Sequence, residues 1–326
     1  MKAIVQDRFG PPDVLRLADV SEPAIGPGDV LIQVHAAALN PYDWHMLRGD
    51  PYVARLFGGV GLTRPRARVA GIDAAGRITA VGPAVRDLKP GQDVLGFCPG
   101  AFAEYAAARA GRVVPLPDGL GFELAAAVPM AATTALRGIG QVGRVQAGQR
   151  VLVNGAAGGV GHYAVQFAVG LGAEVTGVCG PGHVDLVRSL GASHVIDYTA
   201  GDFTATPARY DVILDNVGNL PLGRLRRALT PAGTLVYNAG GSPGHLFGAV
   251  GSMAGVVLAG TVSRQRLRPL PPRQDRAELT AATTSIMDGT VRPVVGGTYP
   301  LAAVPEALRQ VETGHTGGKL VISVRP

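Results

Sequence analysis

The sequence predicts an α/β protein with two domains, the first rich in strands and the second built on a doubly wound parallel sheet. The chain has 326 residues, which is enough for two domains with ample cores. Its first part, about 120 residues, alternates short β-like runs with glycine and proline turns. From Glu123 onward, helical stretches alternate with short apolar strands, as in parallel sheets.

The first part of the chain reads as a series of short strands. The predicted strands are Lys2–Gln6, Asp29–Ala36, Gly71–Val81, Asp93–Gly96 and Phe102–Ala106. Turn sequences such as Gly26-Pro27-Gly28 and Lys89-Pro90-Gly91 separate them. Because no helical stretch alternates with these strands, we expect this part to be all-β.

The second part predicts a parallel sheet, and the chain then returns to the first domain. The predicted parallel strands are Val151–Asn154, Glu174–Val178, His194–Asp197, Val212–Asp215, Thr234–Asn238 and Val256–Thr261. A helix (Arg276–Met287), a strand (Val291–Val295), a helix (Pro305–Glu312) and a last strand (Lys319–Val324) follow. We therefore expect one domain from residues 1–122 and 271–326, and another from residues 123–270.

Composition narrows the class of protein. Apolar residues make up 47% and charged residues 17%, which is typical of a soluble globular chain. The apolar stretch Met253–Val262 is too short and too rich in glycine to span a bilayer, and Met1–Asp7 lacks the apolar core of a signal peptide. Two cysteines, Cys98 and Cys179, cannot form a disulfide framework. We expect no membrane partner and a cytoplasmic location.

The net charge of +6 comes almost entirely from arginine. The densest basic segment, Arg264–Arg276, contains five arginines with prolines between them and no aromatic residue to stack on bases. We expect a solvated loop there and no nucleic-acid partner. An oligomer contact and a polyanion site stay open as alternatives.

A glycine-rich turn at residues 154–161 is the most informative motif. The strand Arg150–Val153 precedes it and an apolar helical pattern follows. Ala156, Gly158 and Gly161 have the spacing of a dinucleotide fingerprint, with alanine in place of the first glycine. Such a turn lets backbone approach a pyrophosphate at a helix N-terminus. We assign Ala157, Gly158, Gly159, Val160 and Gly161 to a nucleotide site, with a βα turn that holds no ligand as the alternative.

With this motif in place, the whole chain resembles the medium-chain dehydrogenase/reductase superfamily. Within it, the chain looks like the zinc-free quinone oxidoreductase branch, which also holds the reticulon-4-interacting mitochondrial protein and chloroplast quinone oxidoreductase homologues. The motifs that carry the resemblance are Met1–Val5, Asn40-Pro41-x-Asp43-Trp44, Gly71–Gly76, Val195–Tyr198 and Asp211–Gly218. The resemblance implies a GroES-like catalytic domain and a Rossmann domain.

Zinc is not expected. Zinc members of the superfamily carry a cysteine near position 39 and Gly-His-Glu near 71–73, whereas this chain has Leu39 and Gly71-Ile72-Asp73. A catalytic zinc needs about three converging protein ligands. The nearby candidates His35, His45, Asp43 and Cys98 match no such spacing.

The preferred nucleotide is NADPH, with NADH possible. Glu174 lies at the beginning of the second parallel strand, so no carboxylate stands where a 2′-phosphate binds. Relatives tend to have Ser-Thr-Arg where this chain has Gly180-Pro181-Gly182. We therefore expect this chain to discriminate less strongly between NADPH and NADH. We assign Cys179, His183 and Tyr198 to this end of the site. The alternatives are a surface His183 and a packed Tyr198.

The segment Asn40–Gly49 is expected to line the cleft between the domains. By resemblance, Asn40 and Asp43 belong to the active-site loop. An asparagine amide can donate to a substrate oxygen, and His45 can donate a proton near neutral pH. Tyr52 is a second candidate donor. The alternatives are a helix cap for Asn40 and an exposed helix residue for His45.

Further cofactor contacts are expected at strand ends, where open α/β sheets bind ligands. Asn216 and Val217 follow one strand, and Asn238 and Gly240 follow the next. By resemblance, Thr134 lies near the nicotinamide and Lys319 near the cofactor. The alternatives are a packed Thr134 and a surface salt bridge for Lys319.

The sequence as a whole favours an NADPH-dependent, zinc-independent oxidoreductase that transfers hydride to quinones or α,β-unsaturated carbonyl compounds. An enoyl-thioester reductase is one alternative. A nucleotide-sensing or RNA-binding protein that has lost turnover is the other. We expect a homodimer.

Overall fold

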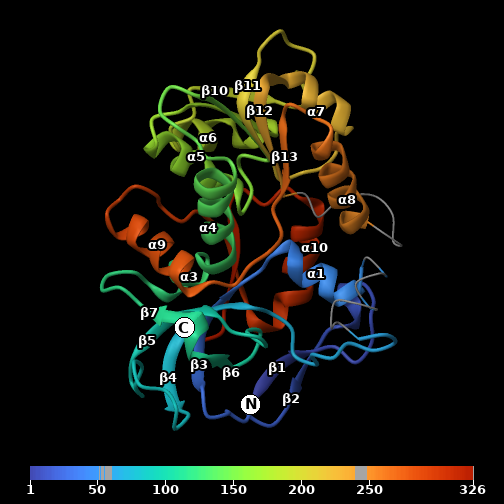
Figure 1. The fold of residues 1–326 in the computed structure, drawn as a ribbon. Helices are drawn as coiled ribbons and strands as arrows, with labels where there is room; N and C mark the ends of the chain where they lie inside the picture. The colour runs from blue at the N-terminus through green and yellow to red at the C-terminus, as the bar shows by residue number, and fades with distance from the viewer. Residues whose placement is uncertain (51, 53–54, 56–60, 239–247, 326) are drawn as a thin grey trace. The chain divides into compact units, whose positions relative to one another are not determined.

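The computed structural model describes residues 1–50, 52, 55, 61–238 and 248–325, and Figure 1 follows them along the chain. The chain divides into two compact units. One consists of Met1–Thr133, Arg273–Met287 and Pro293–Pro326, and the other of Thr134–Pro272 and Asp288–Arg292. Each unit is built around its own sheet.

The first unit contains a seven-stranded sheet and a separate β-hairpin. In spatial order the sheet runs β14 (Val295–Pro300), β15 (Lys319–Ser323), β3 (Asp29–Ala38), β4 (Asp73–Val81), β5 (Asp93–Phe97) and β7 (Val113–Pro115), and β6 (Tyr105–Arg109) also pairs with β3. The hairpin joins β1 (Lys2–Val5) to β2 (Arg16–Asp19). The β-rich character predicted for this part of the chain is confirmed, but the expectation that it is all-β is wrong, because a helix at Pro41–Arg48 lies between β3 and β4.

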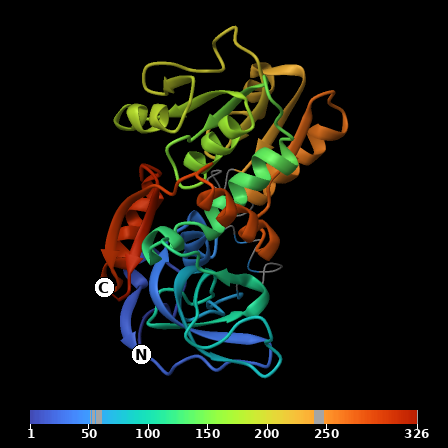
Figure 2. The same ribbon diagram turned by 90° about the vertical axis from the view of Figure 1, so that its left-hand side faces the viewer.

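The last strand of the chain pairs with the end of an early one. Val321 of β15 lies opposite Ala38 of β3 in an antiparallel ladder, and Figure 2 shows the red C-terminal strands beside the blue N-terminal ones. Small residues at Ala36–Ala38 end β3, and all three are buried. This pairing brings Lys319, at the start of β15, next to the residues that follow β3.

Among the described residues, five helices with stated bounds belong wholly or partly to the first unit. They are α1 (Pro41–Arg48), α3 (Phe122–Ala126), α4 (Pro129–Leu136), α9 (Arg276–Met287) and α10 (Val304–Thr313). Helix α1 starts directly after β3, with a proline in its first turn, and ends at Gly49 in the left-handed conformation (φ 62°). The Arg48 guanidinium binds the Glu312 carboxylate of α10 at 2.7 Å, which fixes the far end of α1.

The second unit is a six-stranded parallel sheet. Its order is β10 (His194–Asp197), β9 (Glu174–Cys179), β8 (Arg150–Asn154), β11 (Tyr210–Asp215), β12 (Leu229–Tyr237) and β13 (Arg266–Pro269). Helices α5 (Gly161–Gly170) and α6 (Val184–Ser189) lie on one side, and α7 (Leu222–Ala228) and α8 (Gly248–Thr261) on the other (Figure 1). The strand order reverses between β8 and β11, which is where doubly wound sheets bind ligands.

Three of the predicted strands differ from the structure, and one of them is Phe102–Ala106, which overlaps β6 only at Tyr105 and Ala106. The prediction of a strand at Val256–Thr261 is wrong, because these residues end helix α8 and the sixth strand is β13. A short apolar run does not by itself distinguish helix from strand, and β13 has a single buried apolar residue, Leu267. The strand placed at Val291–Val295 instead begins at Val295 and runs to Pro300. Within the described residues, no helix has the length and apolarity to cross a membrane.

Candidate functional site

A buried polar cluster lies at the junction of β3 and α1. Its members are Asn40, Asp43, Asp73 and Lys319, each at most 4% exposed. The Lys319 ammonium donates to the Asn40 side-chain oxygen and to the Leu39 carbonyl, each at 2.6 Å. The Asn40 amide nitrogen donates in turn to Asp73 Oδ2 at 3.0 Å. Residues far apart in the sequence thus meet in one hydrogen-bonded group.

Asp73 connects this cluster to helix α4. Its Oδ2 atom also accepts the backbone N–H of Met130, in the first turn of α4, at 3.1 Å. The Lys319 ammonium lies 4.0 Å from the same oxygen. The other oxygen, Oδ1, is buried and has no hydrogen-bond partner among the residues that the structure describes. Asp73 therefore bridges the β3–α1 junction and the start of α4 through a single oxygen atom.

Burial shifts the protonation of all three charged groups. Burial, with a smaller contribution from the nearby Asp73 carboxylate, raises the pKa of Asp43 to about 7, against the hydrogen bond from the Asn40 backbone. Burial also raises the pKa of Asp73 to about 6, although Lys319 opposes this rise. The pKa of Lys319 is lowered by burial, against the two carboxylates. Protons in this cluster are therefore exchanged near neutral pH.

These contacts define what Asn40 and Lys319 do in the fold. The Asn40 amide group donates to Asp73 and, at 3.5 Å, to the Ala38 carbonyl, while its oxygen accepts from Lys319. Lys319 belongs to the first unit and points at the β3–α1 junction. Asp73 was not expected from the sequence to be a site residue. The available signal was a carboxylate at the head of an otherwise buried strand, Asp73–Gly76.

Asp43 anchors the start of α1, which carries the predicted donor His45. The Asp43 carboxylate accepts the Asn40 backbone N–H at 2.7 Å, as in a helix N-terminal capping arrangement. The His45 ring stacks on Trp44, with 3.6 Å between ring centroids. Tyr52, the other predicted donor, is 44% exposed, and its ring lies 4.4 Å from the Arg55 guanidinium carbon.

The glycine-rich turn connects β8 to α5 as the sequence predicts. Gly155, not Ala156, adopts the left-handed conformation (φ 76°) that requires glycine. A Cβ at Gly161 would lie 2.0 Å from the Gly155 carbonyl oxygen, so this close packing also requires glycine. At Gly158 a Cβ would meet one atom within 4 Å, the Gly155 carbonyl oxygen at 3.3 Å, which is a tight contact but a far milder one than at Gly161.

The residues assigned to the 2′-phosphate gather at the end of β9. The backbone N–H of Tyr198 donates to the Cys179 carbonyl at 3.1 Å. A Cβ at Gly180 would lie 3.2 Å from the Tyr198 hydroxyl, and one at Gly182 would meet nothing within 4 Å. Cys179 is buried, Tyr198 is 49% exposed, and His183 is half-buried at the start of α6. A side chain would therefore be crowded by Tyr198 at Gly180 but not at Gly182.

Amide side chains cross the carboxyl ends of three neighbouring strands. Asn238 donates to the Asn216 side-chain oxygen at 2.8 Å, and Asn216 donates to the Asn154 carbonyl at 3.1 Å. Asp215 Oδ1 accepts from the Asn154 side chain at 2.8 Å and from the Val217 backbone at 3.1 Å. Asn154 and Asp215 were not assigned from the sequence. They hold the assigned residues in place.

Two further assigned residues are Thr134 and Gly240. Thr134 is 6% exposed and lies on α4, next to a π-helical segment at Arg137–Val142. Such segments occur frequently at functional sites. Gly240 lies outside the described residues.

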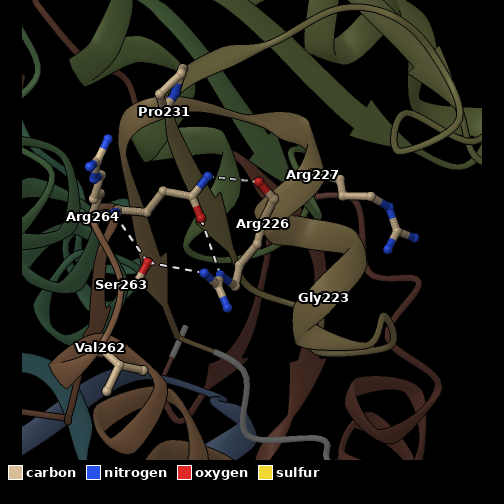
Figure 3. A pocket seen from close by; sticks show the side chains of 8 residues that line it. Gly223, Arg226, Arg227, Pro231, Val262, Ser263 and Arg264 are labelled. Atoms are coloured by element: carbon tan, nitrogen blue, oxygen red, sulfur yellow. Dashed lines mark hydrogen bonds between the residues drawn. The ribbon is translucent and has the colours of Figure 1, made fainter.

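The basic segment borders a surface hollow of about 450 Å³ in the second unit. The Arg226 guanidinium donates to the Gln265 side-chain oxygen and to the Ser263 hydroxyl, each at 3.2 Å. Figure 3 shows that Arg227 and Arg264 point away from Arg226 and from each other. The three arginines therefore do not converge on one point.

Metal ligands do not gather in the described part of the chain. No three His, Cys, Asp or Glu side chains lie there in an arrangement that could hold a metal ion. Cys98 and Cys179 are both free thiols and both buried. Burial raises the pKa of the Cys98 thiol far above its usual range, with the Asp73 charge adding to this.

Comparison with known proteins places this geometry among oxidoreductases. Family models for the alcohol dehydrogenase GroES-like domain and for zinc-binding dehydrogenase match residues 26–118 and 190–322. The mitochondrial NAD(P)H oxidoreductase RTN4IP1 of Bos taurus is 33% identical over 99% of this chain and 89% of its own length. The chloroplastic NADPH-dependent alkenal/one oxidoreductase of Arabidopsis thaliana is 32% identical, over 99% and 79% respectively. The quinone oxidoreductase structure from Coxiella burnetii superposes with a TM-score of 0.88 at 29% identity, over 100% of this chain and 99% of the other.

Proposed function

Because this chain belongs to the quinone oxidoreductase branch of the medium-chain dehydrogenase/reductase superfamily, we propose that it reduces quinones or α,β-unsaturated carbonyl compounds without zinc. The chain is an oxidoreductase, and its cofactor is NADPH. The observation that carries the zinc-free part is the segment Gly71-Ile72-Asp73, where zinc members have Gly-His-Glu, so that Ile72 replaces the histidine. The Asp73 Oδ2 atom, in turn, accepts from Asn40 and Met130.

The proposed roles follow from the contacts of each residue. NADPH, when bound, supplies the hydride. Ala157–Gly161 bind the pyrophosphate, because this turn leads into the N-terminus of α5. Cys179, His183 and Tyr198 line the 2′-phosphate position, and Asn216, Val217 and Asn238 support the nicotinamide half. From the sequence alone, we also propose that Gly240 lies in the cofactor site.

The acceptor side of the site is proposed on α1 and the residues that follow it. Asn40 and Asp43 fix the start of α1, and Thr134 on α4 faces the nicotinamide. His45 or Tyr52 donates a proton to the acceptor oxygen when the acceptor is an enone. A quinone needs less help, because its reduced form is stabilised by conjugation, whereas an enone leaves a more basic oxyanion.

We propose domain boundaries that place residues 1–122 and 271–326 in the GroES-like catalytic domain and residues 123–270 in the Rossmann domain. The separate sheets of the two units support a division into two domains, although the compact units change over at Thr133 and Thr134. Limited proteolysis that releases a stable fragment starting near residue 123 is the expected result.

We also propose a cytoplasmic homodimer. The strand β13 is an edge of its sheet, and unpaired edge strands are templates for pairing with a second copy. Leu258 and Val262, close to this edge in sequence, are 72% and 89% exposed. Two free cysteines suit a reducing compartment. Light scattering on the eluted protein tests the dimer, and cell fractionation tests the location.

A cofactor and acceptor panel tests the proposed activity. Purified protein is mixed with NADPH or NADH and with a simple quinone, an enone or an enoyl thioester, and oxidation of the cofactor is followed by absorbance. We expect turnover with NADPH and a quinone or an enone. Turnover with the thioester alone would instead identify an enoyl-thioester reductase. Cofactor binding without turnover of any acceptor would identify a nucleotide sensor.

A further inference from the structure

The cluster around Asp73 joins rigid strands to two connecting segments. Asp73 opens β4 and pairs with Ala38 of β3 and Phe97 of β5, while Lys319 opens β15 between β14 and β3. Both side chains therefore start from strands with neighbours on both sides. Their hydrogen bonds end on the β3–α1 junction and on the first turn of α4, which lie outside the sheet.

Stability alone does not account for this cluster. Three ionisable groups are buried together, and a buried ion pair is often no more stabilising than packed apolar residues of the same volume. Asp73 Oδ1 is buried without a hydrogen-bond partner in the described part of the chain, which costs further free energy. Such a cluster is retained when it fixes a geometry that function needs.

We propose that Lys319 and Asp73 are positioning residues for the reductase reaction, acting by holding the β3–α1 junction and the start of α4. This proposal rests on the proposed function. Lys319 holds the Asn40 oxygen and the Leu39 carbonyl, and thereby the start of α1, on which Trp44 and His45 lie. Asp73 holds Met130, and thereby the start of the helix that carries Thr134. In this proposal both residues act through Asn40, Leu39 and Met130 and not by direct contact with the cofactor or the acceptor.

The main test replaces Lys319 with methionine, which keeps the length of the side chain but removes its charge and its hydrogen-bond donors. We expect Lys319→Met to lower kcat by about 10²-fold, since small displacements of reacting groups have effects of that size. NADPH affinity, measured by calorimetry, is expected to stay within about twofold of wild type. Lys89→Met is the matched control on an exposed lysine, and it is expected to leave all values unchanged.

A second pair of variants separates hydrogen bonding from charge. In Asp73→Asn, the amide oxygen can replace Oδ2 and accept from both Asn40 and Met130, and the amide nitrogen takes the place of the unpartnered Oδ1. Asp73→Leu removes both acceptors. We expect Asp73→Asn to keep kcat within about tenfold of wild type. Asp73→Leu is expected to lower kcat by as much as Lys319→Met does. This pair decides the question if Lys319→Met does not fold.

A spectroscopic readout makes the test independent of turnover. Trp44 is the only tryptophan of the chain and lies on α1, so its emission reports on the position of that helix. Lys319→Met and Asp73→Leu are expected to shift the emission maximum, whereas Lys89→Met is not. If wild type reduces no acceptor, the proposed function fails, and the emission shift still decides the positioning role.

Three results would overturn the inference. A large loss of NADPH affinity in Lys319→Met would make Lys319 a cofactor ligand. A lower melting temperature with unchanged kcat would make the cluster structural only. Unchanged Trp44 emission in both Lys319→Met and Asp73→Leu would show that the cluster does not hold α1.

Discussion

The Lys319 ammonium lies 2.6 Å from the Asn40 side-chain oxygen, across 279 positions of sequence. Antiparallel pairing of β15 with β3 makes this contact, and the carboxylates of Asp43 and Asp73 surround it. The cluster therefore combines one buried cation with two buried acids. Its protonation, and with it the stability of the first unit, depends on pH.

Stability is expected to fall as Asp43 and Asp73 lose their protons. Both carboxyls have a folded-state pKa above the usual value of 3.8. Between about pH 4 and pH 7 the unfolded chain therefore binds fewer protons than the folded chain at these two sites, so their contribution to the free energy of unfolding decreases as the pH rises. Other carboxylates have a lowered pKa and act in the opposite sense, for example Asp202 and Asp275.

A difference measurement isolates the contribution of Asp43. Asp43→Asn keeps an oxygen that accepts from the Asn40 backbone but removes the titration. Urea denaturation between about pH 4 and pH 8 is expected to give wild type a more negative slope of stability against pH than Asp43→Asn. Asp185→Asn, on a side chain that is 98% exposed, is the control and should parallel wild type. Parallel curves for wild type and Asp43→Asn would contradict the raised pKa.

Substitutions at Gly158 and Gly161, both in the β8–α5 turn, should have different effects. A Cβ at Gly158 would meet only the Gly155 carbonyl oxygen, at 3.3 Å, so Gly158→Val is expected to abolish NADPH binding with a smaller loss of stability than Gly161→Ala. A side chain at Gly161 collides with the Gly155 carbonyl, so Gly161→Ala should lower stability by about 1–3 kcal/mol. Calorimetry and thermal unfolding measure both quantities. Unchanged NADPH affinity in folded Gly158→Val would show that the turn does not bind the cofactor.

Cofactor discrimination should improve when a cation is added beside the 2′-phosphate position. The residues around Gly182 leave room for a side chain, and the resemblance places an arginine of relatives in this segment. Gly182→Arg is expected to favour NADPH over NADH by about tenfold more than wild type does, the scale of one charge-assisted hydrogen bond. Gly223→Arg, at another open glycine, is the charge-matched control. An equal gain in the preference for NADPH over NADH in both variants would show a general effect of the added charge.

Removal of metal ions should not change activity. Prolonged chelation is expected to leave full turnover, and elemental analysis to find no stoichiometric zinc, because Asp73 and Cys98 are not part of a metal-ligand set in the described residues. Re-addition of zinc serves as the control. About one zinc per chain, with activity lost on its removal, would overturn the zinc-free assignment.

Replacing the proton donor should lower turnover only with an enone acceptor. His45→Gln and Tyr52→Phe are expected to change quinone turnover little. With an enone, loss of the true donor should lower kcat by on the order of 10²–10⁴-fold, the scale of general acid catalysis. The loss appears in kcat because the oxyanion develops only towards the transition state. Both variants are assayed with one quinone and one enone at saturation. Near-wild-type rates on both acceptors would exclude both side chains as donors.

Local patterns determined much of the fold. Alternation of apolar strands and helices after Glu123 predicted the parallel sheet, and the glycine spacing at Gly158 and Gly161 predicted the turn between β8 and α5. These features depend on residues near in sequence, whose backbone conformations and periodicities are set locally. The strand β13 was missed, because an edge strand with one buried residue, Leu267, carries almost no apolar pattern.

The tertiary structure alone decided the composition of the buried cluster. The sequence indicated Asn40, Asp43 and Lys319 by resemblance, yet it did not indicate that Lys319 would bind Asn40 or that Asp73 would join them to Met130. These contacts depend on the register of β15 on β3 and of β3 on β4, which brings together residues between 33 and 279 positions apart. Strand register is set by packing across a whole sheet, and a local sequence pattern does not encode it.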